Sequence, residues 1–226
     1  GGSFTLGDLF RHIREGLTYS DGATPITAED FYYAATRLID PDQGHGNASF
    51  KWVNSDAYYN GEAALEDVGV KIIDDYTIEY TFNYPAYESS FTSTSMYAPL
   101  EQAFVEAAGE AFGTSAETYL GNGPMMVSEW VSDASVTLVK NPCYRDPDSV
   151  LIDEIDIVTG ASGDVAVDMV LAGELDIAPL SNANQVATLE GDGCVIFTYT
   201  NSYYGLNLNP VGKTEESGRF LSNANF

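Results

Sequence analysis

The chain has 226 residues, of which 34 are acidic and only 9 basic, so its formal net charge at pH 7 is −25. This charge argues against nucleic-acid binding, because a phosphate backbone needs a basic patch to displace its counterions. It argues equally against direct attachment to an anionic membrane surface. The hydrophobic share of 44% is enough for a real core, as one large domain or two small ones.

The first predicted elements are a strand, a turn and a capped helix. Residues 9–19 alternate loosely and end at a Ser-Asp-Gly turn at 20–22. Thr27 has the chemistry of a helix N-cap, and Asp30 completes an imperfect capping box. Because Pro41 disfavours helical geometry at the residue before it, the helix is expected to end at Asp40.

Two hairpins are predicted next, with a helix between them. Residues 68–72 and 76–82 alternate on either side of an Asp-Asp pair, which indicates a hairpin whose aromatic side chains fill the strand faces. Residues 100–108 are expected to be helical up to Gly109. A second pair of strands is predicted at 125–130 and 135–140.

From residue 151 the pattern favours a βαβ unit. A strand at 152–157 is followed by a helix at 164–171 and a second strand at 175–178. Two further strands are predicted at 194–199 and 203–208.

These elements predict an α/β fold with mixed sheets. We expect a smaller subdomain, residues 20–120, to be inserted into a main subdomain made of 1–19 and 121–226. The main sheet is then expected to combine the N-terminal strand with the later strands.

Motifs for nucleotide, metal or covalent chemistry are weak in this sequence. The "GKT" of residues 212–214 lacks the first glycine of a phosphate loop and its apolar helix. Asp40 and Asp42 begin a calcium-like loop, but Lys51 stands where the bidentate Glu should be, which favours a turn. His12 and His45 have no partner at zinc-ligand spacing. No metal site and no cofactor are therefore predicted.

The two cysteines, Cys143 and Cys194, are predicted not to form a disulfide. A βαβ unit is expected between them, and a disulfide needs Cα atoms within about 7 Å. Paired carboxylates for glycoside cleavage stay open as an alternative, because 34 acids offer many pairs and nothing singles one out.

The order of motifs resembles the extracellular solute-binding proteins of ABC importers, in the oligopeptide, dipeptide and nickel class. The resemblance is carried by "IREGLTYSDGATPITAEDFYYAATRLIDP", "VGVKIIDDYTIEYTFNYPAYESSF", "GNGPMMVSEWVSDASVTLVKNPCYRD" and "AGELDIAPL", which come in the family's order. The sequence departs from the family pattern at Tyr19, where Trp is usual, and at "NPCYR", where Asn-Pro-Asp-Tyr-Trp is usual. The tail after Pro210 matches poorly.

The resemblance implies a fold like one lobe of a periplasmic binding protein, and a binding function without catalysis. Such proteins are roughly twice this length and hold their ligand between two lobes, so we expect this chain to lack the second lobe and to bind peptides weakly alone. By resemblance, the ligand contacts of this lobe are expected from Tyr87, Met96, Tyr97, Asn122, Gly123, Tyr203, Tyr204 and Asn207.

The resemblance also implies the partners and the location. We expect a peptide ligand, the permease subunits of an ABC importer, a monomeric state, and an extracytoplasmic location in which a lipid anchor would lie outside this chain. Peptides are favoured over nickel, because the long spacer from Asp40 to Glu66 and the hairpin resemble those of oligopeptide binders. The absence of a histidine cluster agrees with this preference. The alternatives are a binder of nickel or another small solute, and a carbohydrate-active enzyme with paired carboxylates.

Overall fold

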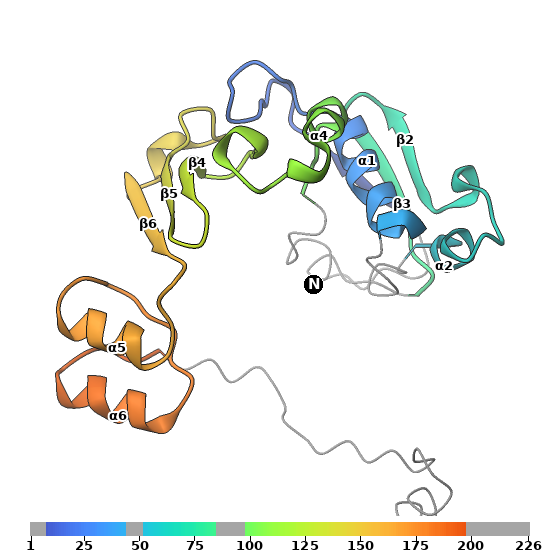
Figure 1. Ribbon diagram of the computed structural model, residues 1–226. Helices are drawn as coiled ribbons and strands as arrows, with labels where there is room; N and C mark the ends of the chain where they lie inside the picture. Colours follow the sequence, from blue (N-terminus) through green and yellow to red (C-terminus); the bar gives the residue numbers. More distant parts are fainter. Residues whose placement is uncertain (1–7, 44–51, 85–97, 198–226) are drawn as a thin grey trace, which may run out of the picture. The chain divides into compact units, whose positions relative to one another are not determined.

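The computed structural model describes residues 8–43, 52–84 and 98–197, and it divides the chain into two compact units, residues 1–160 and 161–226 (Figure 1). The strands and α-helices of the first unit are β1 (Asp8–His12), α1 (Ala28–Ile39), α2 (Ser55–Tyr59), β2 (Val70–Asp74), β3 (Thr77–Thr81), α4 (Gln102–Ala108), β4 (Met125–Val131), β5 (Ser135–Lys140) and β6 (Glu154–Val158). The described part of the second unit contains α5 (Asp164–Leu171) and α6 (Ala183–Gly191).

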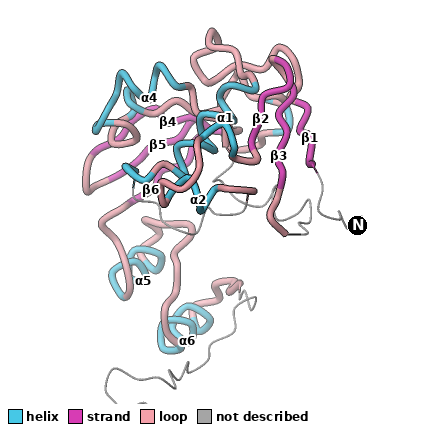
Figure 2. Tube along the Cα trace, turned by 90° about the vertical axis from the view of Figure 1, so that its right-hand side faces the viewer, coloured by secondary structure: helices cyan, strands magenta, loops and turns pink. Residues whose placement is uncertain are grey.

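The first sheet has the strand order β1-β3-β2, and both of its strand pairs are antiparallel. The predicted hairpin forms β2 and β3, whose pairing has an irregularity between Ile72 and Asp74. Helix α1 packs on this sheet (Figure 2). Phe31, Ala35 and Ile39 of the helix share one buried cluster with strand residues. Periodicity of 3.6 on the helix and of two on the strands explains why these side chains meet.

Helix α1 begins and ends where its sequence predicts. Thr27 is the N-cap, and its backbone N–H donates to the Asp30 carboxylate over 2.7 Å. The Thr27 hydroxyl lies 3.3 Å from the same oxygen. Asp40, the residue before Pro41, is the C-cap with extended backbone angles.

The predicted turn at 20–22 is also present. The Asp21 carboxylate accepts hydrogen bonds from the backbone N–H groups of Ala23 and Thr24 and from the Thr24 hydroxyl. These bonds, with the hydroxyl contributing most, lower the pKa of Asp21. Gly22 has a φ of +70°, which favours glycine at this position.

The second sheet has the order β4-β5-β6 and is again antiparallel throughout. Leu138 on β5 lies opposite Ile155 on β6, and Val136 lies opposite Ile157. None of the residues in these three strands is fully buried by the described part of the chain. Within the first unit the described residues leave these strands half-buried or exposed, so their alternating apolar pattern formed the sheet without a fully buried face.

The α/β class is confirmed, but the predicted pairing of the first strand is wrong. We expected the N-terminal strand to join the later strands, whereas β1 pairs with β3 over residues 8–12 and 77–81. The hairpin alone would leave one edge of β3 with unpaired backbone groups, and β1 satisfies them. The proposed subdomain boundaries, 20–120 within 1–19 and 121–226, stay a prediction.

The second unit contradicts part of the predicted βαβ unit. Helix α5 has the predicted bounds, but residues 175–178 form no strand, and Ile177 is exposed. A strand needs a neighbour to pair with, and the described residues of this unit, 161–197, contain none. Residues 194–197 are likewise outside any strand, while 198–208 lie outside the described residues.

Helix α6 was not predicted, and a polar side chain ties it to α5. Asn182 caps its start by accepting from the backbone N–H groups of Asn184 and Gln185, each over 3.0 Å. The buried Gln185 donates to Asp164 over 2.8 Å and accepts from the backbone of Ser181 over 2.9 Å.

Among the described residues, no helix is long and apolar enough to cross a bilayer. Cys143 and Cys194 are each a free thiol. Because they lie in different units, the absence of a bond between them stays a prediction.

Candidate functional site

Only two of the eight predicted ligand contacts lie in the part of the chain that the structure describes. Asn122 and Gly123 belong to the loop that precedes β4. The other six lie outside the described residues: Tyr87, Met96, Tyr97, Tyr203, Tyr204 and Asn207.

The loop around Gly123 is held in place by Asn141, which is fully buried. The Asn141 side-chain amide donates to the carbonyl of Gly123 over 2.8 Å, and its carbonyl accepts from the backbone N–H of Cys143 over 2.9 Å. The Asn141 backbone N–H also donates to Pro124 over 3.0 Å. The Asn141 side chain therefore joins the loop at 121–124 to the Asn-Pro turn (residues 141–145), a link that the sequence alone did not reveal.

The opening turn meets the same two segments. The backbone N–H of Ser20 donates to the carbonyl of Gly121 over 2.8 Å. A Cβ placed on Gly22 would lie 3.1 Å from the Cys143 sulfur, so the opening turn and the Asn-Pro turn approach closely. Residues 18–26, 121–124 and 141–145 thus converge, although they are far apart in sequence.

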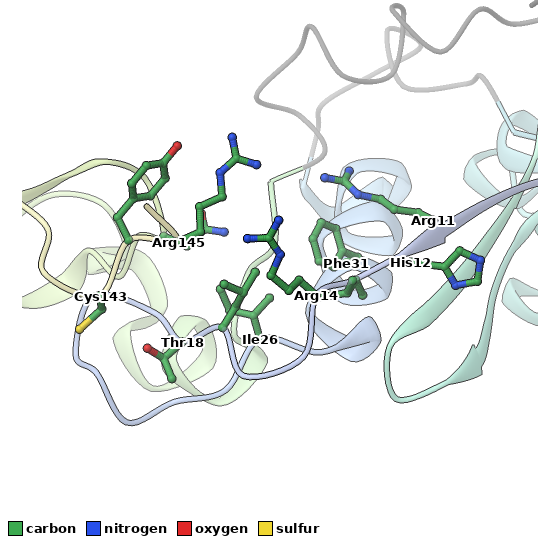
Figure 3. Close-up of a pocket in the computed structure, with 12 residues that line it drawn as sticks. Arg11, His12, Arg14, Thr18, Ile26, Phe31, Cys143 and Arg145 are labelled. Carbon is green, nitrogen blue, oxygen red and sulfur yellow. The ribbon is translucent and has the colours of Figure 1, made fainter. Parts of the chain in front are cut away.

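A cavity of about 410 Å³ opens where these segments meet β1 and α1 (Figure 3). Its floor includes the buried side chains of Ile13, Ile26 and Phe31. Asn122 is the predicted contact that lines it. The remaining lining residues are Arg11, His12, Arg14, Leu17, Thr18, Cys143, Tyr144 and Arg145.

Three arginines line this cavity, although the whole chain has only nine basic residues. Arg11 is half-buried, with its guanidinium 4.6 Å from the centre of the Phe31 ring. Burial lowers the pKa of Arg11, but an arginine stays charged at neutral pH. Arg145 lies 5.7 Å from the ring of Tyr144. Figure 3 shows the guanidinium ends of Arg11, Arg14 and Arg145 directed toward the same space.

Sequence reasoning missed this arginine cluster. The scarcity of basic residues could have drawn attention to it, because two of them stand three positions apart in "FRHIRE". The third, Arg145, is more than a hundred residues away, and only the fold brings it near.

His12 belongs to no metal-binding group among the described residues. Its Nδ1 lies 3.2 Å from the Thr77 hydroxyl, and Figure 3 shows the ring turned away from the arginines. Among residues 8–43, 52–84 and 98–197, no group of three His, Cys, Asp or Glu side chains could hold a metal ion.

Among the described residues, the buried carboxylate of Asp30 is the best candidate for acid–base chemistry. Burial raises its pKa, and that of Tyr19 nearby, while Glu101 adds to both effects. Its oxygen accepts from the Thr27 backbone, however, and Glu101 accepts from the backbone N–H of Phe104. Both carboxylates therefore serve as helix caps, and their geometry does not favour the enzyme alternative.

The family assignment follows from a comparison with known protein families. Residues 11–226 match the family described as bacterial extracellular solute-binding proteins, family 5. The chain belongs to this family. The resemblance drawn from the four sequence blocks is thereby confirmed.

The curated relatives carry names that refer mostly to peptides. A dipeptide-binding protein of Bacillus subtilis, DppE, is 31% identical over 201 residues, covering 87% of this chain and 37% of the relative. The oligopeptide-binding protein OppA of the same organism is 31% identical, with 80% and 34% covered. A probable deoxycholate-binding periplasmic protein of Escherichia coli, YgiS, is 28% identical, with 87% and 38% covered.

Solved structures agree on the fold. Listeria monocytogenes OppA, described as bound to peptide, matches with a TM-score of 0.74 at 26% identity, covering 85% of this chain and 39% of that one. Burkholderia pseudomallei OppA matches with a TM-score of 0.75 at 25% identity, with 83% and 37% covered. The α/β architecture is thus that of the oligopeptide-binding proteins, and the chain spans little more than a third of their length.

Proposed function

We propose that this chain is part of the substrate-binding component of an ABC importer, which binds oligopeptides or dipeptides outside the cytoplasm and delivers them to a membrane permease. Membership of the solute-binding family carries this proposal. The names of the relatives, two of which denote dipeptide and oligopeptide binding, favour peptides within that family.

The ligand contacts form part of this proposal. They would come from the loop Asn122–Gly123, from the segment with Tyr87, Met96 and Tyr97, and from the segment with Tyr203, Tyr204 and Asn207. Aromatic side chains with hydrogen-bonding tips suit a site that holds extended peptides without chemistry. The anchoring of the 121–124 loop by the buried Asn141 supports this role for Asn122 and Gly123, because a rigid loop presents its backbone groups at low entropic cost.

The location, partners and organisation follow from the same assignment. The family's extracellular description supports an extracytoplasmic location, and we propose a lipid anchor and a monomeric state for the whole protein. The boundaries at 20 and 120 of a smaller inserted subdomain belong to the proposal as well. The solute-binding family gives no support to an enzyme.

Calorimetry tests the function. The 226-residue chain and the complete gene product that contains it are titrated with a mixed library of di- to pentapeptides. We expect micromolar binding by the complete product and much weaker binding by the chain, because a ligand held by one lobe loses part of its hydrogen bonds and stays open to water.

Two results would contradict this account in different ways. A complete product that binds none of the peptides would rule out the function. Equal, salt-insensitive binding by the chain alone would show that one lobe suffices.

A further inference from the structure

The cavity between β1, α1 and the Asn-Pro turn is unusual for its charge. The chain as a whole repels anions at long range because of its −25 charge, yet a third of its nine basic residues line this one cavity. Placing like charges close together costs electrostatic free energy. The cluster of positive charges also attracts anions at short range, even though the chain as a whole is strongly acidic.

Two of the three arginines have no acidic partner among the described residues. The ion pair recorded there joins Lys140 to Asp153, outside the cavity. The Arg145 guanidinium lies over the ring of Tyr144. Its N–H donors have no carboxylate partner in the described part of the chain. The same holds for Arg14, whose side chain is exposed. Each guanidinium presents paired N–H donors that match a carboxylate.

Apolar side chains also line the cavity. Ile13, Ile26 and Phe31 are buried and form its floor, and Leu17 adds further apolar surface. A volume of about 410 Å³ is in the range of small-molecule sites. An inorganic anion would use the arginines but leave the apolar floor uncovered.

We propose that this cavity binds the carboxylate of an organic acid, with Arg14 and Arg145 holding the carboxylate and the apolar floor holding the body of the ligand. Asn122 and Thr18 supply neutral hydrogen-bonding groups in the same lining. The carboxylate can belong to a free organic acid or to the C-terminus of a peptide. The inference does not rest on the proposed transport function, because the free acid requires neither a permease nor a second lobe.

The test is calorimetry on the 226-residue chain with matched ligand pairs. The first pair is 3-phenylpropionate and its neutral amide, and the second is acetyl-Ala-Phe with a free C-terminus and the same peptide amidated. We expect each acid to bind at least about tenfold more tightly than its amide, which corresponds to about 1.4 kcal/mol. The stronger-binding acid identifies the source of the carboxylate, and either source supports the proposal.

Variants assign the binding to the cavity. Arg14→Gln and Arg145→Gln are each expected to weaken acid binding by about tenfold while leaving amide binding unchanged. Lys71→Gln removes an exposed positive charge on β2, outside the cavity, and should bind the acids as the parent chain does. Both arginines are exposed, and unchanged circular dichroism spectra will show that the variants fold.

Several outcomes would overturn the proposal. These are the absence of acid binding by the folded chain, equal binding of acid and amide, and full binding by both arginine variants. Displacement of the acid by inorganic phosphate at equal concentration would also overturn it, since the cavity would then select charge without the apolar body.

Discussion

The two sheets of the first unit have the same architecture but different environments. Each has three antiparallel strands with the middle strand paired on both sides. In the first sheet Val70, Ile78 and Tyr80 are buried with helix α1. In the second, the apolar residues of β4, β5 and β6 are half-buried or exposed. Within the first unit, alternation is enough to form a strand, whereas full burial of the first sheet accompanies the matching apolar face of α1.

The largest effect expected from this comparison concerns two isoleucines. Ile78 on β3 is 0% exposed, and Ile157 on β6 is 43% exposed. Ile78→Ala should lower the free energy of unfolding by about 2–5 kcal/mol, because it leaves a cavity in a packed core. Ile157→Ala should cost less than about 1 kcal/mol. Urea denaturation of both variants measures this, and equal losses would contradict the comparison.

Two glycines give a second contrast, because replacing each with alanine should change the free energy of unfolding in opposite directions. A Cβ on Gly69 would lie 2.5 Å from the carbonyl oxygen of Thr81, whereas a Cβ on Gly160 would lie 3.6 Å from that of Asp133. Gly69→Ala should destabilise the protein by about 1–3 kcal/mol through overpacking. Gly160→Ala should be neutral or stabilise by up to about 1 kcal/mol. Thermal unfolding distinguishes them, and a stable Gly69→Ala variant would show that the first sheet can yield there.

Two carboxylates of the first region should respond to pH in opposite directions. Burial raises the pKa of Asp30, so its contribution to stability is present below the ordinary pKa of about 3.9 and is lost as pH rises through the folded value. Hydrogen bonds lower the pKa of Asp21, so its contribution is present above about pH 3.9 and is lost as pH falls through the folded value.

Asparagine variants isolate these contributions. Relative to the parent chain, Asp30→Asn should gain stability as pH rises from 4 to 7, and Asp21→Asn should lose it as pH rises from 3 to 5. Denaturation curves across this range provide the measurement. The same sign of pH dependence for both variants would contradict the assigned causes.

The smallest effect is expected at the second sheet's surface. The Lys140–Asp153 pair has an N–O distance of 3.2 Å, and the Asp153 side chain is 92% exposed. Lys140→Gln should change the free energy of unfolding by less than about 1 kcal/mol, and less still in 1 M salt. A larger, salt-independent loss would show that the second sheet depends on this pair.

The sequence predicted elements well where local chemistry decides them. The bounds of α1 follow from Thr27, Asp30 and Pro41, and the β2–β3 hairpin follows from alternation around an Asp-Asp turn. The sequence-based predictions failed where the pairing of a strand with a distant strand decides the structure. Residues 175–178 are apolar enough for a strand but have no neighbouring strand among residues 161–197. Strand β1 pairs with β3, and its residue His12 lies opposite Thr77, 65 positions later in the sequence.

The candidate site was harder to predict than the fold. Asn122 was expected from the family resemblance as a ligand contact; it lines the cavity, and its role as a contact stays a prediction. The arginine cluster was not expected, since Arg145 stands where the family's pattern usually has Trp. Arg11 and Arg14 lie close in the sequence, but the approach of Arg145 to them is a product of tertiary structure, which no local pattern reveals.

Native mass spectrometry of the complete gene product, purified without added ligand, tests the central claim most directly. The proposed function predicts retained species whose masses are those of short peptides, released when the protein is unfolded. Retention of a metal ion or a sugar instead, with no peptide among the released species, would contradict it.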